Sequence, residues 1–310
     1  MGQNKKIQIL LSTYNGYKFI KTQLESILSQ ENISDIKILV RDDGSIDETK
    51  EYLKAVSLEY DFIEVIFGKN VGVNRSYFEL LECADKNCDY FAFSDQDDIW
   101  LPFKMKRAMD FLDRVSEFQK PCLYSSRSEI VDENLEHIGE VLNPIKPVGF
   151  YNAVAQNVMP GHTQVFNRAA LEMTLKHGYH KNIHVIDWWM YLSVAAMGEV
   201  FFDPDITVKH RQHSDNTVGY RINFVEQSFA RIKRAFSDER NKPALQLKAF
   251  SDLYYDDMPE EYRTEVRSYL SGLKKFSDKI RYVISAKAYR QSGFETALFK
   301  VLYLFGKYKI

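Results

Sequence analysis

Three carboxylates stand within four residues at Asp95, Asp97 and Asp98, directly after a short apolar run. Carboxylates this close repel one another, and a folded chain seldom gathers them without a compensating cation. Hard divalent ions such as Mg²⁺ or Mn²⁺ take oxygen ligands and are often shared with substrate phosphates. The alternative is an acidic helix start, because Asp is favoured at the cap and in the first turn of a helix. The cluster alone does not decide between a metal site and a cap.

Two other polar clusters each follow an apolar run of strand length. Their members are Thr13, Tyr14 and Asn15 in the first cluster and Asp42 and Asp43 in the second. Each of these clusters alone is an ordinary turn. Together with the carboxylates they predict one crevice, in which a carboxylate accepts the N3–H of uracil or thymine, a tyrosine stacks on the base and another carboxylate holds the ribose.

The first third of the chain alternates strand and helix signals. Apolar runs of strand length occupy residues 7–12, 36–40, 62–67 and 90–94, and helical spacing covers residues 17–29, 47–60 and 75–84. Such alternation predicts an α/β fold with a mainly parallel central sheet flanked by helices. Sheets of this kind bind ligands at the carboxyl ends of their strands, which is where the three polar clusters fall.

The pattern changes beyond the first third. Residues 121–219 mix strand, loop and helix signals, and the pattern is helical from about residue 220 to the end. We therefore predict a domain over residues 1–220 and a helical C-terminal extension over residues 221–310.

Charge is unevenly distributed. The formal net charge of −2 argues against a protein that binds nucleic acid. Residues 271–310, however, hold 9 Lys/Arg against 2 Asp/Glu, which predicts an anionic partner. Apolar residues recur there at helical spacing from Phe294 to Phe305. Such a basic amphipathic helix either lies on an anionic membrane surface or packs on protein with its lysines in solvent, and the sequence leaves both open.

Compartment signals are few. Cys83, Cys88 and Cys122 have neither zinc spacing nor an even count, so they indicate free thiols in a reducing compartment. The N-terminal apolar run is too short for a signal peptide, and no apolar run approaches the length of a spanning helix. We expect a cytoplasmic protein, or one that is peripheral on the inner face of the cell membrane.

A series of motifs follows the order seen in one enzyme family. The segments ILLSTYNG, ILVRDDGSIDET and FSDQDDIW resemble the donor-binding half of glycosyltransferase family 2, which has the GT-A fold. Residues 70–72 and 161–168 are also similar to segments of this family. Residues 187–189, 211–213 and 216–219 are similar to elements of its bacterial rhamnosyltransferase-like members, so that the resemblance covers roughly residues 5–220. It implies a metal-dependent, inverting transfer of a sugar from a nucleotide-diphosphate donor.

The resemblance also implies roles for individual residues. Those implied to hold the nucleotide are Thr13, Tyr14, Asn15, Asp42, Asp43, Asn70 and Asp95. Asp97, Asp95 and His213 are the implied ligands of Mn²⁺ or Mg²⁺, and Asp98 assists them or caps the next helix. Asp187 matches the general base that deprotonates the acceptor hydroxyl in inverting members. By its position it also suits a cap for a helix that starts at Trp188.

The residues that the resemblance implies on the acceptor side are Trp188, Trp189, His162 and Arg211. We expect one tryptophan in the core and one at the sugar. His162 stands where family members often carry a small residue or a cysteine, so this departure bears on the choice of acceptor. His210 is expected to be structural.

The implied donor is dTDP-rhamnose, or else a UDP-hexose, and the implied acceptor is a growing lipid-linked polysaccharide of the cell wall, capsule or O-antigen. A nucleotidyltransferase also uses an acidic metal site, but it carries a Gly-rich basic loop near the N-terminus, where this chain has TYNG. A non-catalytic carbohydrate-binding protein would have a decayed site, and the intact Asp95, Asp97 and Asp187 argue against decay.

Overall fold

The computed structural model describes residues 5–31, 35–114, 120–213 and 241–310, which form two compact units. Unit 1 contains Met1–Asn143, Met159–Tyr179 and Phe201–Gly219, and unit 2 contains Pro144–Val158, His180–Val200 and Tyr220–Ile310. The C-terminal helices thus belong with two stretches from the middle of the chain, which the sequence-based division assigned to the first domain. The motif at 216–219 and the boundary expected at residue 220 lie outside the described residues.

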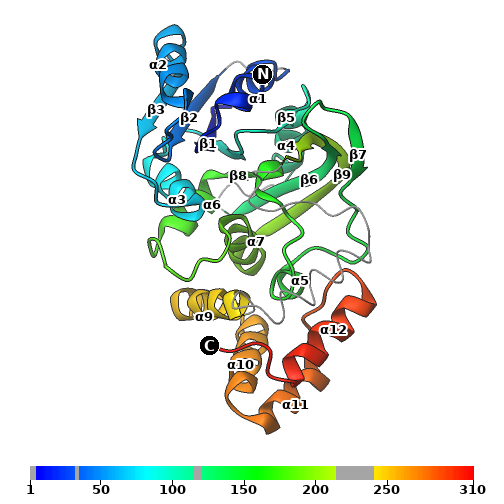
Figure 1. Cartoon of the computed structure of the whole chain (residues 1–310). Helices are drawn as coiled ribbons and strands as arrows, with labels where there is room; N and C mark the ends of the chain where they lie inside the picture. The colour runs from blue at the N-terminus through cyan, green and yellow to red at the C-terminus, as the bar shows by residue number, and fades with distance from the viewer. Residues whose placement is uncertain (1–4, 32–34, 115–119, 214–240) are drawn as a thin grey trace. The chain divides into compact units, whose positions relative to one another are not determined.

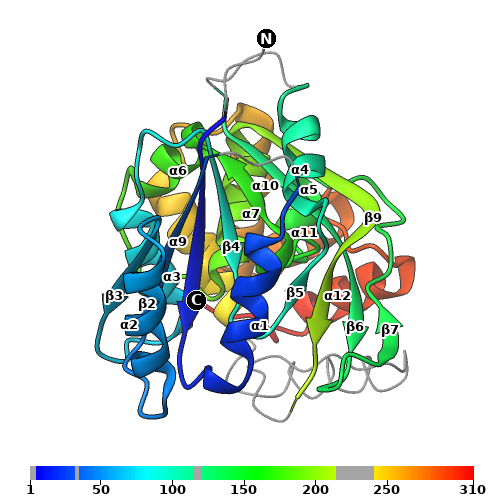
Figure 2. The same cartoon turned by 90° about the horizontal axis from the view of Figure 1, so that it is seen from above.

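A nine-stranded sheet forms the centre of unit 1 in the described part of the chain. The order is β3-β2-β1-β4-β8-β6-β9-β5, with β7 paired to β6. The strands are β1 (Ile7–Thr13), β2 (Ile36–Asp42), β3 (Ile63–Phe67), β4 (Tyr90–Ser94), β5 (Ile99–Trp100), β6 (Cys122–Val131), β7 (His137–Glu140), β8 (Val165–Asn167) and β9 (Glu199–Arg211). Figure 1 shows β1, β2 and β3 side by side, and Figure 2 shows β4 beside the dark blue β1.

The first four strands are parallel. Ile9 of β1 is opposite Ile38 of β2 and Ala92 of β4, and β2 pairs in parallel with β3. β1 and β4 consist almost wholly of buried residues, because helices cover both faces of a parallel sheet. Antiparallel strands extend the sheet beyond β4, beginning with β8 and β6. The predicted α/β fold is confirmed.

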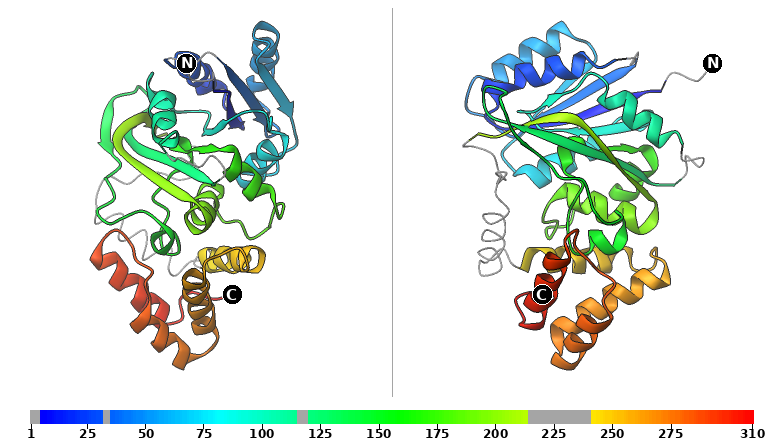
Figure 3. Two further views of the ribbon diagram at one scale, coloured as in Figure 1. Left: turned by 180° about the vertical axis from the view of Figure 1, so that it is seen from behind. Right: turned by 90° about the vertical axis from the view of Figure 1, so that its right-hand side faces the viewer.

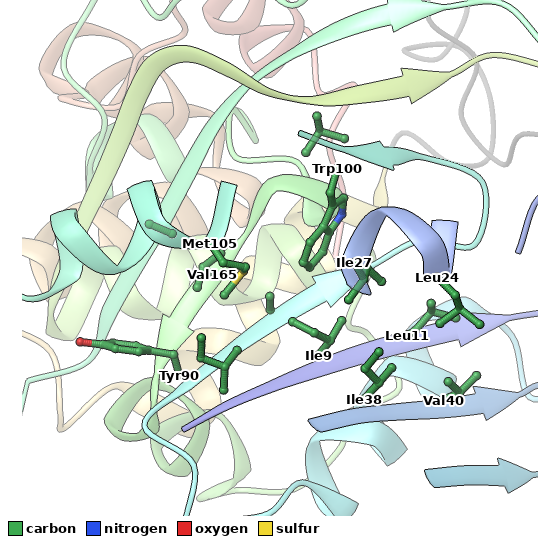
Figure 4. Packing of buried hydrophobic residues seen from close by; sticks show 14 of the residues in the cluster. Ile9, Leu11, Leu24, Ile27, Ile38, Val40, Tyr90, Trp100, Met105 and Val165 are labelled. Carbon is green, nitrogen blue, oxygen red and sulfur yellow. The ribbon is translucent and has the colours of Figure 1, made fainter. Parts of the chain in front are cut away.

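The helices between the strands fill in the core. α1 (Tyr17–Leu28), α2 (Thr49–Glu59) and α4 (Lys104–Leu112) contribute to one hydrophobic cluster with the strands, shown in Figure 4. In α1 the buried Ile20, Leu24 and Ile27 recur at the helical period, so that one side of the helix faces the sheet. α3 (Val73–Cys83) packs on β1, and α6 (Arg168–Leu175) packs on α3 and β4.

Unit 2 is helical. Its helices are α5 (Phe150–Ala153), α7 (Ile186–Met197), α9 (Lys242–Tyr254), α10 (Glu260–Lys274), α11 (Phe276–Ser285) and α12 (Gly293–Leu304), and Figure 3 shows the last three in orange to red. Pro243 lies in the first turn of α9 and Pro259 is the N-cap residue of α10, and a proline is favoured at the start of a helix. None of the helices among the described residues has the length and apolarity that crossing a bilayer requires.

Candidate active site

The acidic cluster lies between β4 and β5, at the carboxyl end of the parallel part of the sheet. β5 pairs antiparallel with the end of β9. This pairing brings His210, Arg211 and His213 alongside Asp97 and Asp98, although 112 to 116 residues separate the partners along the chain. The fold therefore adds histidines to the carboxylates from a distant part of the sequence.

Asp97 and His213 form a close pair. Asp97 Oδ2 lies 2.8 Å from His213 Nε2, and both side chains are nearly buried. The Phe19 ring packs on the His213 ring with 4.7 Å between centroids, which restricts the imidazole. Burial and the neighbouring Asp98 carboxylate raise the pKa of Asp97. A carboxylate oxygen and an imidazole nitrogen together offer two ligands to a divalent cation.

Asp95 lies beside Tyr77 of α3. The Tyr77 hydroxyl is 2.5 Å from Asp95 Oδ1 and 2.7 Å from the carbonyl oxygen of Ser94. Burial, together with the charges of Asp98 and Asp97, raises the pKa of Asp95 to about 7. The pKa values of Asp95 and Asp97 are raised because these buried carboxylates lie close to further negative charge, and a divalent cation beside them would supply positive charge. The residues present therefore fit a metal ion.

Asp98 is tied to β9. Its Oδ1 lies 2.7 Å from His210 Nδ1 and accepts a hydrogen bond from the Arg211 N–H at 3.2 Å. Burial alone would lower the pKa of His210, but the Asp98 carboxylate outweighs burial and raises that pKa to about 9. Asp98 Oδ2 is buried and has no hydrogen-bond partner among the described residues. His210, which was expected to be structural, thus forms an ion pair with the buried Asp98 of the acidic cluster.

His162 stacks on His210 from η1 (Gly161–Thr163). The ring centroids are 4.3 Å apart and the rings are parallel. His162 Nε2 lies 2.6 Å from Ser128 Oγ. Burial, and then the charge on His210, lower the pKa of His162 to about 3. His162 is therefore neutral and His210 charged at neutral pH.

Two neighbouring groups offer ligand atoms to an ion. Ligand atoms of Asp98, His162 and His210 lie within 4.8 Å of one another, which makes this trio a possible metal site. The trio already contains its own cation, the protonated His210. The pair of Asp97 and His213, with Asp95 nearby in the chain, is the group whose carboxylates have raised pKa values. A divalent cation therefore fits the second group better.

Two further basic side chains hold the main chain around the carboxylates. Arg211 Nε donates to the carbonyl oxygen of Asp97 at 2.9 Å, and its guanidinium lies 4.7 Å from the centre of the Phe19 ring. Lys104 Nζ of α4 donates to the carbonyl oxygen of His162 at 2.8 Å, and burial lowers the pKa of this lysine far below its ordinary value. These bonds position the Asp97 turn and η1.

The loop after β1 is joined to the acidic cluster through Gln96. Thr13 Oγ1 and the Tyr14 N–H both donate to Gln96 Oε1, at 2.6 and 2.9 Å. Gly16 suits this loop because a Cβ at its position would collide with the side chains of Gln96 and Thr13. The Tyr14 ring is exposed, as stacking on a base requires. The sequence had predicted no role for Gln96, whose one signal was its place between acidic residues.

Asp42 and Asn15 shape the turn after β2. Asp42 is fully buried, and its Oδ2 accepts hydrogen bonds from the N–H groups of Gly44 and Ser45 at 3.2 and 3.1 Å. Asn15 Oδ1 accepts from the Ile46 N–H at 2.9 Å, and the Asn15 N–H donates to Ser45 Oγ at 2.8 Å. These two residues thus join the loops that follow β1 and β2.

Asp43 is engaged by a buried arginine. Arg41 Nη1 donates to Asp43 Oδ1 at 2.6 Å, and the same carboxylate accepts hydrogen bonds from the N–H groups of Val71 and Gly72 at 2.9 Å. The exposed Asn70 precedes these two residues. Asp43 therefore positions the Asn70 segment at the end of β2.

Asp187 lies in the first turn of α7, in unit 2. The helix begins at Ile186, and its N-cap residue Val185 makes no side-chain cap. Asp187 Oδ1 accepts a hydrogen bond from the Trp188 N–H at 2.6 Å. Asp187 is thus inside the helix, one position beyond the helix start, whereas the cap interpretation placed it before a helix starting at Trp188.

The two tryptophans have different surroundings. Trp188 is half-buried, and its Nε1 donates to the carbonyl oxygen of Ala153 at 2.7 Å. Trp189 is fully buried and packs on Phe250 and Tyr254 of α9. A buried ring has no face open to a sugar, so Trp188 is the one of the two that an acceptor could reach.

Comparisons with known sequences identify the family. The family model described as Glycosyl transferase family 2 matches residues 8–171. The dTDP-rhamnosyl transferase RfbG of Shigella flexneri is 30% identical over 224 residues, which are 69% of this chain and 75% of that protein. An uncharacterized glycosyltransferase of Haemophilus influenzae is 24% identical over 263 residues, which are 80% of this chain and 74% of that protein.

Solved structures share the fold. TarS 1–349 of S. aureus in complex with UDP superposes with a TM-score of 0.57 at 15% identity, over 91% of this chain and 75% of that one. The mannosyltransferase PcManGT from Pyrobaculum calidifontis, in complex with GDP-Man and Mn²⁺, superposes with a TM-score of 0.53 at 15% identity, over 97% and 85%. The chain is therefore a glycosyltransferase with the GT-A fold. It belongs to glycosyltransferase family 2 and is rhamnosyltransferase-like.

Proposed function

We propose that this enzyme transfers rhamnose from dTDP-rhamnose with inversion at the anomeric carbon. The identity of 30% to the dTDP-rhamnosyl transferase of Shigella flexneri supports this donor. A hexose from a UDP-sugar is the second choice, since the TarS structures hold UDP and UDP-GlcNAc. The observation that carries the proposal is the contact of Asp97 with His213 at the carboxyl end of the sheet.

Asp97 and His213 are the proposed metal ligands, with Asp95 as a third ligand or a ribose contact. A bound divalent cation would neutralise the developing charge on the diphosphate leaving group. We favour Mn²⁺ over Mg²⁺, because Mg²⁺ takes oxygen ligands almost alone and His213 offers a nitrogen. Asp98 is proposed to hold β9 through His210, so that His213 stays beside Asp97.

The nucleotide is proposed to lie along the loops after β1 and β2. The exposed Tyr14 ring would stack on the base, with Thr13 and Asn15 in the same loop. Asp42 and Asp43 have carboxylates that already accept main-chain hydrogen bonds. Their proposed contribution is therefore to hold the two loops, with any contact to the base made in addition.

Asp187 is the proposed general base. Its carboxylate would accept the proton of the acceptor hydroxyl while that oxygen bonds to the anomeric carbon and the bond to the diphosphate breaks. The half-buried Trp188 beside it would present a ring to the acceptor sugar. His162 and Arg211 would bear on the acceptor by positioning η1 and the Asp97 turn.

The proposed acceptor is a growing lipid-linked polysaccharide, as in the synthesis of O-antigen, capsule or cell wall. Such an acceptor would place a cytoplasmic enzyme at the inner face of the membrane. The basic C-terminal segment is the proposed contact, since cations near an anionic leaflet are attracted to it.

A donor screen tests the proposal. The full chain is mixed with dTDP-rhamnose, UDP-glucose, UDP-galactose or UDP-GlcNAc, with and without Mn²⁺, and the released nucleotide is measured. We expect release of dTDP that requires Mn²⁺. Release of nucleotide from a UDP-sugar alone would show that the donor is that UDP-sugar and not dTDP-rhamnose. A failure to bind or turn over any nucleotide sugar would overturn the proposal.

A further inference from the structure

α11 carries an apolar stripe that faces away from the protein. Phe276, Ile280 and Ile284 recur every four residues, which places them on one side of the helix. Their side chains are exposed by 67%, 41% and 79%. On the opposite side, Tyr282 is buried against Tyr303 with 4.7 Å between ring centroids. α11 thus buries an aromatic residue on one side and exposes apolar side chains on the other.

α12 has a second stripe of the same kind. Phe294 and Val301 in the helix, and Phe305 at its C-cap, are seven and four residues apart and lie on one side. All three are exposed, whereas Phe299 and Tyr303 on the opposite side are buried. An exposed apolar side chain alone is ordinary, but two continuous stripes mark an interaction surface.

The two helices pack on each other and on α10 through one aromatic cluster. Tyr269 of α10 contacts Tyr282 of α11 and both Phe299 and Tyr303 of α12. Since each stripe is opposite the side of its helix that joins this cluster, both stripes face outward from unit 2. Figure 1 and Figure 3 show α11 and α12 next to each other at the C-terminal end of the chain.

The charge around the stripes is strongly positive. Residues 271–310 contain two acids, and both lie next to arginines: Asp278 forms an ion pair with Arg281 at 3.1 Å, and Glu295 lies 3.5 Å from Arg290. The same segment holds seven lysines, which are Lys274, Lys275, Lys279, Lys287, Lys300, Lys307 and Lys309. The partner of the surface must therefore combine an apolar layer with negative charge.

We infer that α11 and α12 together form a docking surface for an anionic lipid bilayer. Exposed apolar stripes on helices of a lysine-rich segment are typical of helices that lie in a membrane interface. A second copy of the chain is disfavoured as the occupant, because self-association would set two such basic segments against each other. The inference extends the proposed membrane contact. It rests on the proposed function only in explaining why the enzyme would bind a membrane. It adds the α11 stripe, because the amphipathic helix predicted from the sequence extended only from Phe294 to Phe305.

Vesicle co-sedimentation of the full chain tests the surface. We expect binding to vesicles of phosphatidylcholine mixed with phosphatidylglycerol, weak binding to phosphatidylcholine alone, and weakening by salt, since a lysine near the surface contributes roughly fivefold. The triple variant Phe294→Ser/Val301→Ser/Phe305→Ser and the pair Ile280→Ser/Ile284→Ser should each lose about tenfold or more in binding.

A matched control separates this surface from general apolar exposure. Leu58 at the exposed end of α2 in unit 1 is 89% exposed, and Leu58→Ser should bind vesicles as the unchanged chain does. Thermal unfolding checks that the stripe variants fold, and release of nucleotide from a soluble donor reports on the transferase separately. Equal vesicle binding by the stripe variants would overturn the inference. The inference would also be overturned if the unchanged chain formed a dimer and bound no vesicles, while the stripe variants were monomers.

Discussion

The carboxylate of Asp97 and the imidazole of His213 lie 2.8 Å apart, although 116 residues separate them in the chain. The short strand β5 follows the acidic turn directly and pairs with the end of β9. This strand pairing places His213 beside the carboxylates. The next residue, Asp98, makes a similar contact at 2.7 Å with His210, which lies three residues before His213. Two adjacent acid–histidine contacts thus join the same two segments.

Replacing Asp97 by asparagine should weaken metal binding by about 10- to 100-fold or more, because a neutral amide is a poorer ligand and no longer pairs with His213. The measurement is the Mn²⁺ concentration that gives half-maximal release of nucleotide from the donor. Asp110→Asn, an exposed carboxylate of α4, is the control and should behave like the unchanged protein. An unaltered Mn²⁺ requirement in Asp97→Asn would remove this residue from the metal site.

Replacing His210 by alanine should destabilise unit 1 by about 3–5 kcal/mol, since it leaves the buried Asp98 carboxylate without its charged partner. Denaturant unfolding measures the change. The double variant Asp98→Ala/His210→Ala should lose less than the two single changes together, because removing both charges leaves no unpaired ion. Strict additivity would show that the two residues do not act as a pair.

The stability of the protein should depend on pH through His162. Its pKa is about 3 in the folded state against about 6.5 when unfolded, so the unfolded chain binds the extra proton between these values. The contribution of neutral His162 is fully present above about pH 6.5 and falls as the pH is lowered toward 3. At about pH 5 the loss relative to neutral pH is about 2 kcal/mol.

The variant His162→Gln isolates this effect, since glutamine keeps a polar group near Ser128 and does not titrate. Its free energy of unfolding should change about 2 kcal/mol less between about pH 7 and pH 5 than that of the unchanged protein. Parallel pH profiles for the two proteins would show that His162 is not buried as a neutral ring.

Replacing Asp187 by asparagine should lower kcat by about 100-fold or more, because the acceptor hydroxyl loses its proton acceptor. Binding of the donor should stay within about threefold, since the change removes no proposed donor contact. Asp256→Asn, an exposed acid of the same unit, is the control. Full activity in Asp187→Asn, or an equal loss of donor binding, would exclude it as the general base.

Much of the fold was predictable because it depends on local patterns. The apolar run at residues 90–94 became β4 with the same bounds, and the polar clusters after β1, β2 and β4 lie at the carboxyl ends of the parallel strands. Short apolar runs that alternate with stretches of helical spacing indicate strands and helices from neighbouring residues alone. One sequence is therefore enough to predict this arrangement.

The contacts of His210 and the division into units were not predictable in the same way. His210 reaches Asp98 through the pairing of a two-residue strand with β9, and so short a strand leaves no hydrophobic period to detect. Residues 144–158 and 180–200 join the C-terminal helices through contacts between distant segments. The α11 stripe was missed because its apolar spacing looks the same whether that side is buried or exposed.

Titration calorimetry of dTDP binding is the most direct test of a metal-dependent nucleotide site at Asp97 and His213. The unchanged chain, Asp97→Asn and Asp110→Asn are each titrated with dTDP in the presence and absence of Mn²⁺. We predict tight binding that needs Mn²⁺ in the unchanged chain and in Asp110→Asn, and binding weakened about tenfold or more in Asp97→Asn. Binding that is equally tight without Mn²⁺ and in Asp97→Asn would contradict the proposed site.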